Sequence, residues 1–330
     1  MRRRRSNVFS GPLRSEFDDF AAYRQSLGTC HGHVWVVLRH LDDFLEQEAS
    51  VTRDLTQQLL NEWMTRLADR AAITRRNYFR VARQFCVFRA RADPAGFIPD
   101  AVSCPRVTTR FRPYIYSDQE IRALIKAATM LSGELRPHTY ATLLLLLYTT
   151  GVRIGEAIRL QLRDLDRGRA VLHVRAGKFG KSRLVPITTS VMARLELYLE
   201  RRRQVNANTD PEAPLFWNLR RGPYSLIGVQ QGISQLIRAV CEKRPGTGTW
   251  PRVHDVRHTF AVHRLLRWYR EGADVQAKLP LLATYLGHHS FLSTQFYLTA
   301  TPELLAEASR RFHHSFGSLI HVQEEPYDNE

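Results

Sequence analysis

Four prolines between residues 93 and 113 mark the best candidate for a linker between two parts of the chain. Proline lacks a backbone N–H and fixes φ, so this spacing interrupts any helix or interior strand. At 330 residues the chain is long enough for two domains, each with its own core. We predict an N-terminal domain with linker over residues 1–110, a second domain over 111–316 and an acidic tail over 317–330.

The first hundred residues carry apolar side chains at helical spacing, which predicts a small helical bundle. The expected helices cover residues 16–27, 34–48, 55–68 and 74–91. In the second, Asp42 falls within the apolar stripe of Leu38, Leu41 and Leu45. The fourth mixes six arginines with four aromatic residues. Two interpretations of it stay open: a helix that faces DNA, or a solvated basic face over an aromatic core.

The second part begins near Tyr114 with a helix start, because Ser117 and Glu120 have the spacing of a capping box. The expected helices cover residues 117–131, 137–150, 154–160, 191–203, 226–241, 254–269, 279–286 and 302–312. Stretches 170–175 and 183–187 flank a glycine-bounded turn and predict one β-hairpin. The predicted fold class is therefore mainly α with a small β-sheet, an α+β second domain after an N-terminal helical bundle.

Charge points to a polyanionic partner. The chain has 48 Lys and Arg against 32 Asp and Glu, a formal net charge of +16. Each phosphate that such a protein neutralises releases condensed counterions, which favours binding to nucleic acid. An arginine-rich composition from a GC-rich genome is the alternative explanation.

The sequence also predicts a cytoplasmic protein with no membrane partner. The four cysteines are scattered without a CxxC pair, so neither a disulfide framework nor a zinc knuckle is expected. The basic start, MRRRRSNVF, is followed by no apolar signal region. The longest apolar run, residues 141–148, is less than half of the roughly 20 residues that a membrane span needs. It predicts a buried helix instead.

Four segments of the second part place a cation, a histidine or a tyrosine beside a glycine or a helix start. They are TGVRIGEA (150–157), GKFGKSRLVP (177–186), HDVRHTF (254–260) and LGHHSFLSTQFY (286–297). His254 and His258 have the spacing of a metal-binding pair, but no glutamate follows His254, so the zinc signature is absent. We expect no metal and no cofactor.

In this order and spacing the four segments resemble the catalytic motifs of the tyrosine recombinases, also called phage integrases. The resemblance covers most of residues 114–312, and it assigns the catalytic roles to Arg153, Lys178, His254, Arg257, His288 and Tyr297. The helical bundle resembles the family's core-binding domain in architecture and position. One departure is the segment Arg270–Pro280, which is longer than the family pattern and is expected to form a loop.

The residue types suit phosphoryl transfer without a metal ion. Arg153 and Arg257 can grip the non-bridging oxygens of a phosphodiester and neutralise the charge that grows in the transition state. Tyr297 is the expected nucleophile, and an arginine-rich pocket is expected to ease its ionisation. His254 is a candidate proton acceptor or phosphate donor, and His288 a donor to the scissile phosphate.

The resemblance also assigns roles to two lysines of the predicted hairpin, and one acidic residue has an expected supporting role. By resemblance, Lys178 protonates the leaving 5′-oxygen, whereas Lys181 contacts backbone phosphate. Glu156, three residues after Arg153, is expected to hold the cations of the pocket in place.

The resemblance implies site-specific recombination of duplex DNA through a 3′-phosphotyrosine, without ATP. It also implies a homotetramer on paired DNA sites, associated with the nucleoid, with the helix over 302–312 packed either on a neighbouring subunit or on its own domain. A mobile element is the expected carrier. Two alternatives stay open: a type IB topoisomerase that only relaxes DNA, and a DNA-binding module without catalysis.

Overall fold

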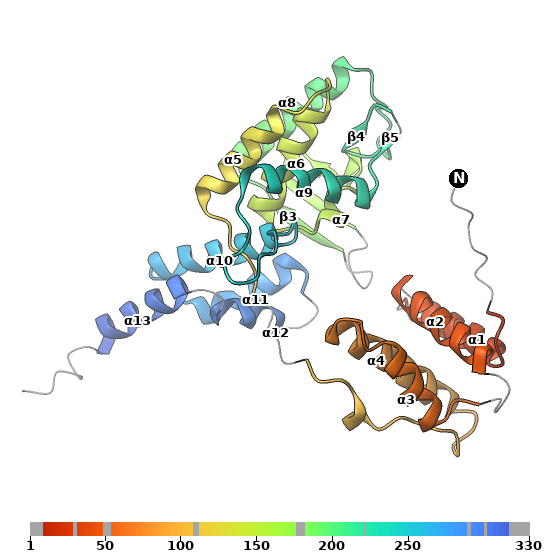
Figure 1. Cartoon of the computed structure of the whole chain (residues 1–330). Helices are drawn as coiled ribbons and strands as arrows, with labels where there is room; N and C mark the ends of the chain where they lie inside the picture. Colours follow the sequence, from red (N-terminus) through yellow and green to blue (C-terminus); the bar gives the residue numbers. More distant parts are fainter. Residues whose placement is uncertain are drawn as a thin grey trace, which may run out of the picture. The chain divides into compact units, whose positions relative to one another are not determined.

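The computed structural model consists of two compact units, Met1–Phe111 and Arg112–Glu330. It describes residues 9–28, 32–48, 54–107, 112–175, 182–220, 222–288, 292–299 and 302–316. Figure 1 shows helices in both units, and short strands in the second. Each unit has its own hydrophobic core.

In its described residues, the first unit is a bundle of four helices. They are α1 (Arg14–Ser26), α2 (Gly32–Glu48), α3 (Gln57–Arg66) and α4 (Ala72–Arg89), followed by a short 3₁₀ turn at Ala101–Ser103. Aromatic rings fill the centre of the bundle: Phe17, Trp63 and Phe85 are completely buried. The helices lie within a few residues of the predicted positions because their apolar spacing matches the face that the bundle buries.

Asp42 is buried because its carboxylate is hydrogen-bonded, and not because it contributes to the apolar stripe of α2. Its carboxylate accepts hydrogen bonds from the backbone N–H groups of Ser10, at 2.8 Å, and Gly11, at 3.0 Å. Only 1% of its surface is exposed, and burial raises its pKa. The acid therefore ties the segment before α1 to α2, a long-range contact that helical spacing could not predict.

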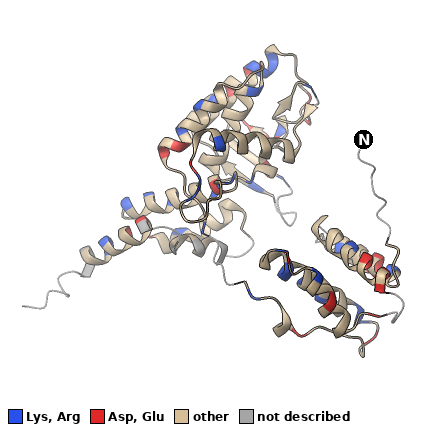
Figure 2. Ribbon diagram, viewed as in Figure 1, with Lys and Arg blue, Asp and Glu red and all other residues tan. Residues whose placement is uncertain are grey.

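Helix α4 separates its aromatic and basic residues by face. Tyr78, Phe79 and Phe85 are buried, whereas Arg76 and Arg80 are exposed. Figure 2 shows basic positions repeated along this helix. The aromatic core that one interpretation of this segment required is therefore present, and it leaves a basic face available to solvent or to a ligand.

The second unit is also mainly helical. Its elements are α5 (Asp118–Thr129), α6 (Arg136–Thr150), α7 (Ile154–Ala157), a 3₁₀ turn (Leu162–Asp164), β1 (Leu165–Asp166), β2 (Val171–Val174), β3 (Arg183–Pro186), α8 (Thr189–Gln204), β4 (Trp217–Asn218), β5 (Gly222–Pro223), α9 (Leu226–Val240), α10 (Asp255–Arg270), α11 (Val275–Leu286), α12 (Leu292–Gln295), η4 (Phe296–Thr299) and α13 (Pro302–Phe316). The predicted capping box is present, since Ser117 and Glu120 bond each other's backbone N–H. The mainly α fold with a small sheet is confirmed.

The predicted hairpin is β2 paired antiparallel with β3, with Val171 opposite Pro186 and Val174 opposite Arg183. The short strand β1 adds to the other edge of β2, and β4 and β5 form a separate two-stranded sheet. Strands β1, β4 and β5 are only two residues long each, too short to leave a period-2 pattern in the sequence.

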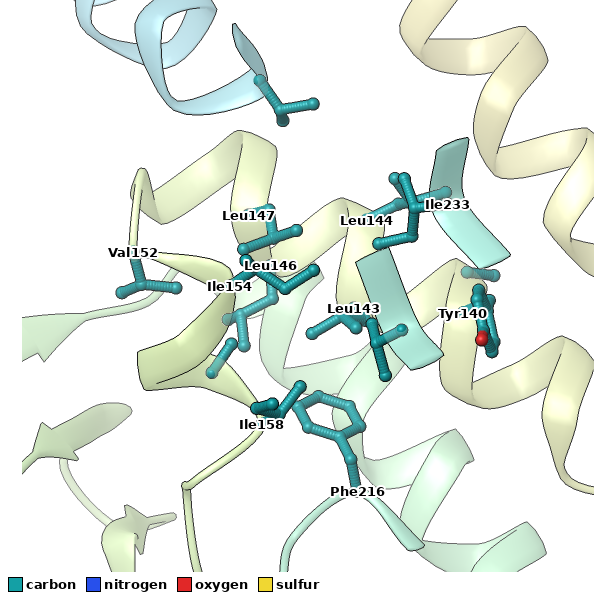
Figure 3. Packing of buried hydrophobic residues seen from close by; sticks show 14 of the residues in the cluster. Tyr140, Leu143, Leu144, Leu146, Leu147, Val152, Ile154, Ile158, Phe216 and Ile233 are labelled. Carbon is teal, nitrogen blue, oxygen red and sulfur yellow. The ribbon is translucent and has the colours of Figure 1, made fainter. Parts of the chain in front are cut away.

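Helix α6 passes through the core of the second unit. Leu143, Leu146 and Leu147 are buried on it, close to Ile154 of α7 and Phe216 (Figure 3). The apolar run that predicted a buried helix is therefore confirmed. A smaller cluster joins α10, α11 and the C-terminal helices, and it includes Tyr297.

The predicted loop over residues 270–280 is wrong in its second half. Helix α11 begins at Val275, and the side chain of Asp274 caps it by accepting the N–H of Ala277 at 3.0 Å. Pro280 lies inside the helix. The helix predicted over 279–286 starts earlier, because the Asp274 cap and the burial of Val275 and Leu279 extend it by an additional turn.

The last helix, α13, packs on its own unit in this structure. Leu304 is buried, and Arg311 donates to the carbonyl oxygens of Ala273 at 2.9 Å and Gly272 at 3.1 Å. Across the described residues, we find no helix that combines the length and the apolar character needed to cross a bilayer.

Candidate active site

The site begins at the end of α6, where the chain turns sharply into α7. Gly151 caps α6 with a left-handed φ of 61°, which glycine adopts without steric cost. A Cβ at this position would stand 2.4 Å from Cδ1 of Phe260. The turn places Arg153 immediately before α7, and the guanidinium of Arg153 is partly exposed.

Glu156 holds two arginines from different parts of the chain. Its side chain is 1% exposed and lies 2.8 Å from Nη1 of Arg153 and 2.7 Å from Nη2 of Arg183 on β3. It also accepts the backbone N–H of Arg153 at 3.0 Å. Burial alone raises the pKa of Glu156, but the hydrogen bonds and charges of Arg183 and Arg153 outweigh it and lower the pKa to about 2. The acid is therefore ionised at neutral pH.

Arg257 is a buried cation on the first turn of α10. Its guanidinium donates to the carbonyl oxygens of Gly151 and Leu286, both at 2.6 Å. Burial and the like charge of Arg153 lower the pKa of Arg257 to about 9, so it stays charged at neutral pH. A guanidinium has five N–H donors, so these two bonds can set its plane while further donors serve a ligand.

His254 precedes α10 and stands beside the two arginines. Its imidazole opens to solvent, yet partial desolvation and the charges of Arg257 and Arg153 lower its pKa to about 4. The start of the helix is anchored by Asp255, which is completely buried and pairs with Arg252 at 3.0 Å and Arg244 at 3.2 Å.

His288 follows the end of α11, which Gly287 caps with a φ of 66°. The Gly287 carbonyl accepts a hydrogen bond from Nη2 of Arg153 at 3.2 Å, which joins this turn to α7. Nδ1 of His288 lies 2.7 Å from Oγ1 of Thr294. Burial and the charges of Arg257 and Arg153 lower the pKa of His288 to about 3.

Tyr297 lies in the 3₁₀ turn η4 and is 2% exposed. Its Oη is 2.9 Å from Nδ1 of His258, and its ring stacks on that of His288 with a centroid distance of 6.0 Å. The two arginines ease its ionisation as expected, but they do not bring its pKa below the ordinary value. Burial raises the pKa of Tyr297, and the charges of Arg257 and Arg153 lower it by less.

The fold thus gathers five of the six predicted catalytic residues, together with Glu156. The five are Arg153, His254, Arg257, His288 and Tyr297, and the two arginines act electrostatically on the other three. Lys178 and Lys181 lie outside the described residues.

Sequence reasoning missed two residues that touch this cluster. His258 was considered only as a metal ligand, although its position directly after Arg257 places it one turn from His254. Arg183 was noted only as part of the hairpin. Its place on a strand facing buried Glu156 depends on the tertiary fold.

Chemically, the cluster can bind an anion and present a hydroxyl to it. Two cations held by backbone carbonyls and a carboxylate form a rigid positive site, and a buried phenol lies in the same cluster. Among the described side chains, no group of three or more His, Cys, Asp or Glu could hold a metal ion.

Comparison with known proteins identifies the class. Residues 115–303, more than half of the chain, match the phage integrase family. The chain therefore belongs to that family, the tyrosine-type site-specific recombinases.

Two relatives from Sinorhizobium fredii (strain NBRC 101917 / NGR234) are named as integrase/recombinases. The first, y4rB, is 40% identical over 273 residues, which cover 80% of this chain and 86% of the relative. The second, y4rE, is 33% identical over 311 residues, 92% of this chain and 97% of the relative.

Among solved structures, the XerH site-specific recombinase bound to palindromic difH substrate, in a post-cleavage complex, superposes with a TM-score of 0.65. It is 17% identical, and the alignment covers 91% of this chain and 84% of that chain. At this identity the likeness concerns the fold alone.

Proposed function

We propose that this recombinase cleaves and rejoins duplex DNA through a covalent bond between Tyr297 and a 3′-phosphate. The observation that supports this most strongly is the convergence of Arg153 and Arg257 on the site that contains the Tyr297 hydroxyl. A phosphodiester resists attack because its anionic oxygens repel the nucleophile, and two fixed guanidiniums offset that repulsion.

Each surrounding group has a distinct role in this proposal. Arg153 and Arg257 bind the non-bridging oxygens, and Glu156 keeps Arg153 in place through their 2.8 Å ion pair. His254 and His288 are neutral at pH 7, so each can donate one N–H to the scissile phosphate.

The hairpin completes the site. Lys178 gives a proton to the leaving 5′-oxygen, and Lys181 contacts backbone phosphate. Both follow β2, whose partner strand β3 carries Arg183. The Arg183 pair with Glu156 therefore links the hairpin to the site.

We further propose that the reaction needs neither metal nor ATP. The guanidiniums supply the charge that metal ions supply in other phosphoryl-transfer sites. The phosphodiester is exchanged for a phosphotyrosine of similar energy, so a 5′-hydroxyl from another duplex can reverse the bond.

The first unit (residues 1–110) would act as a DNA-binding domain in addition to the catalytic domain (111–316), through the exposed arginines of α4. The complete complex would be a homotetramer on two paired sites, acting on a mobile element in the bacterial nucleoid. Recombinase genes or inverted repeats beside the gene would support the mobile element, and their absence would count against it.

Covalent trapping tests the chemistry. The chain is incubated with a randomised library of nicked duplexes, and DNA that stays attached in detergent is recovered and sequenced as substrate. We expect attachment by the wild type, unaffected by EDTA, and none by Tyr297→Phe, which removes only the nucleophilic oxygen. Attachment by the variant would exclude Tyr297 as the nucleophile.

Two further outcomes separate the alternatives. Binding without attachment by the wild type would indicate a silent DNA-binding module. Relaxation of supercoiled DNA without exchange between two duplexes would indicate a topoisomerase.

A further inference from the structure

His258 contacts the reacting atom but has no part in the roles described so far. It lies on α10, one turn after His254, and its Nδ1 is 2.9 Å from Oη of Tyr297. The two residues are 39 positions apart in the chain, so the contact is made by the packing of α10 against η4. It is a hydrogen bond of ordinary length between a ring nitrogen and a phenol.

Two imidazoles lie next to the phenol, and a third lies next to one of them. The ring of His258 is 5.5 Å from that of Tyr297 between centroids, and His288 stacks on the phenol ring at an interplanar angle of 22°. His254 meets His258 almost perpendicularly, with the ring centroids 4.9 Å apart. The hydroxyl therefore lies where a proton can pass to a nitrogen without crossing bulk water.

Electrostatics set the direction of the hydrogen bond. Burial and the neighbouring His254 lower the pKa of His258 to about 4, with Arg252 and Arg257 acting in the same direction and Asp255 against it. The imidazole is therefore neutral at pH 7 and can accept. Burial raises the pKa of Tyr297, so the phenol keeps its proton and donates.

We propose that His258 is a further catalytic residue, which accepts the phenolic proton of Tyr297 as its oxygen attacks the DNA phosphate. This inference rests on the proposed function. In the step, the Oη–P bond forms and the P–O5′ bond breaks. The phenolic proton moves to Nδ1 of His258, whose Nε2 already carries a hydrogen, and the leaving O5′ takes a proton from Lys178. In rejoining, His258 returns its proton to Tyr297.

Substrate binding would make this transfer easier. The positive charges of Arg257 and nearby groups oppose a second proton on His258. A phosphodiester held by Arg153 and Arg257 adds a negative charge close to the imidazole, which favours its charged form. The nucleophile would thus stay protonated until a phosphate is in place.

Three variants, compared in single-turnover cleavage of the trapped DNA sequence, test the role. His258→Ala should slow cleavage by roughly a hundredfold to ten-thousandfold, the usual effect of losing a positioned acid or base. Added imidazole should restore part of that rate. His258→Asn should stay slow, because an amide oxygen can accept the hydrogen bond but cannot take the proton at pH 7.

His263→Ala is the matched control. His263 lies on the same helix and its Nδ1 is 3.1 Å from the hydroxyl of Tyr148, outside the catalytic cluster. We expect it to cleave at the wild-type rate. DNA affinity and thermal unfolding, measured for all variants, separate a loss of chemistry from a loss of fold.

The results that would overturn the proposal are distinct. Cleavage by His258→Ala as fast as the wild type, or faster, would mean that His258 only restrains the resting tyrosine. Wild-type rates in His258→Asn would mean that a hydrogen bond without proton transfer is enough. A wild-type chain that never attached to DNA would overturn the proposed function and this inference with it, whereas wild-type attachment with undiminished variants overturns this inference alone.

Discussion

Replacing Glu156 with glutamine keeps the shape of the side chain and removes the charge that pairs with Arg153 and Arg183. The magnitude follows from the pKa. The ordinary value of 4.5 and the value of about 2 in the folded chain differ by about 2.5. Each pKa unit corresponds to about 1.4 kcal/mol. Because the side chain is 1% exposed, solvent screening is slight, and Glu156→Gln should lower the free energy of unfolding by about 3 kcal/mol at pH 7.

The lowered pKa of Glu156 also determines how the effect of the substitution on stability depends on pH. Folding lowers the pKa of Glu156, so its ionised form stabilises the native state at pH values above 4.5. That contribution is lost as the pH falls towards 2. The difference between wild type and Glu156→Gln should therefore be constant near neutral pH, shrink below pH 4.5 and vanish near pH 2.

Urea unfolding of the full chain, followed by circular dichroism and tryptophan fluorescence, measures the difference. Glu200→Gln is the control, because Glu200 pairs with Arg203 and both side chains are about half exposed. Removing such a surface pair should cost less than about 1 kcal/mol. If Glu156→Gln were no more destabilising than this control, or if its effect did not depend on pH, the buried charge network would not contribute as we reason.

Three further predictions concern the turn, the hairpin and DNA. Gly151→Ala should destabilise the chain by roughly 1–3 kcal/mol, because its Cβ would stand 2.4 Å from Phe260, and it should weaken activity because Arg257 bonds the Gly151 carbonyl. In the same unfolding assay, Gly246→Ala should show only backbone strain, because Gly246 has a φ of 76° and open space around it. Lys178→Ala should slow cleavage by roughly a hundredfold or more, and its cleavage rate should recover on DNA with sulfur at the 5′-bridging position. Lys181→Ala should only lose DNA affinity. If the sulfur substrate rescued Lys181→Ala but not Lys178→Ala, the two lysines would exchange roles. DNA affinity should fall about a thousandfold between roughly 50 and 200 mM salt, and a flat dependence would count against extensive phosphate contacts.

Local sequence signals were sufficient wherever an element depends on its own residues. The apolar run of α6 predicted a buried helix, and Ser117 with Glu120 predicted the start of α5. Both signals act within a few residues of chain. The same reasoning started α11 too late, because the Asp274 cap and the burial of Val275 and Leu279 extend the helix before residue 279.

The family motifs likewise predicted which residues belong to the site, but not how they are held. Arg153 bonds a carbonyl 134 residues away, and Arg257 bonds one 106 residues away. No short pattern contains such contacts. Asp42 shows the same limit in the first unit, since its partners Ser10 and Gly11 are more than 30 residues distant.

By itself, therefore, the amino-acid sequence determined most of the helices, the hairpin, the family and the motif residues that the fold gathers with Tyr297, but not the contacts of His258 and Arg183. The tertiary structure alone decided their electrostatic state. Whether the two arginines bring the pKa of Tyr297 below its ordinary value depends on how completely the phenol is removed from water, and here burial outweighs both arginines. The contact with His258 is likewise decided by packing, because it requires α10 and η4 to meet at hydrogen-bonding distance.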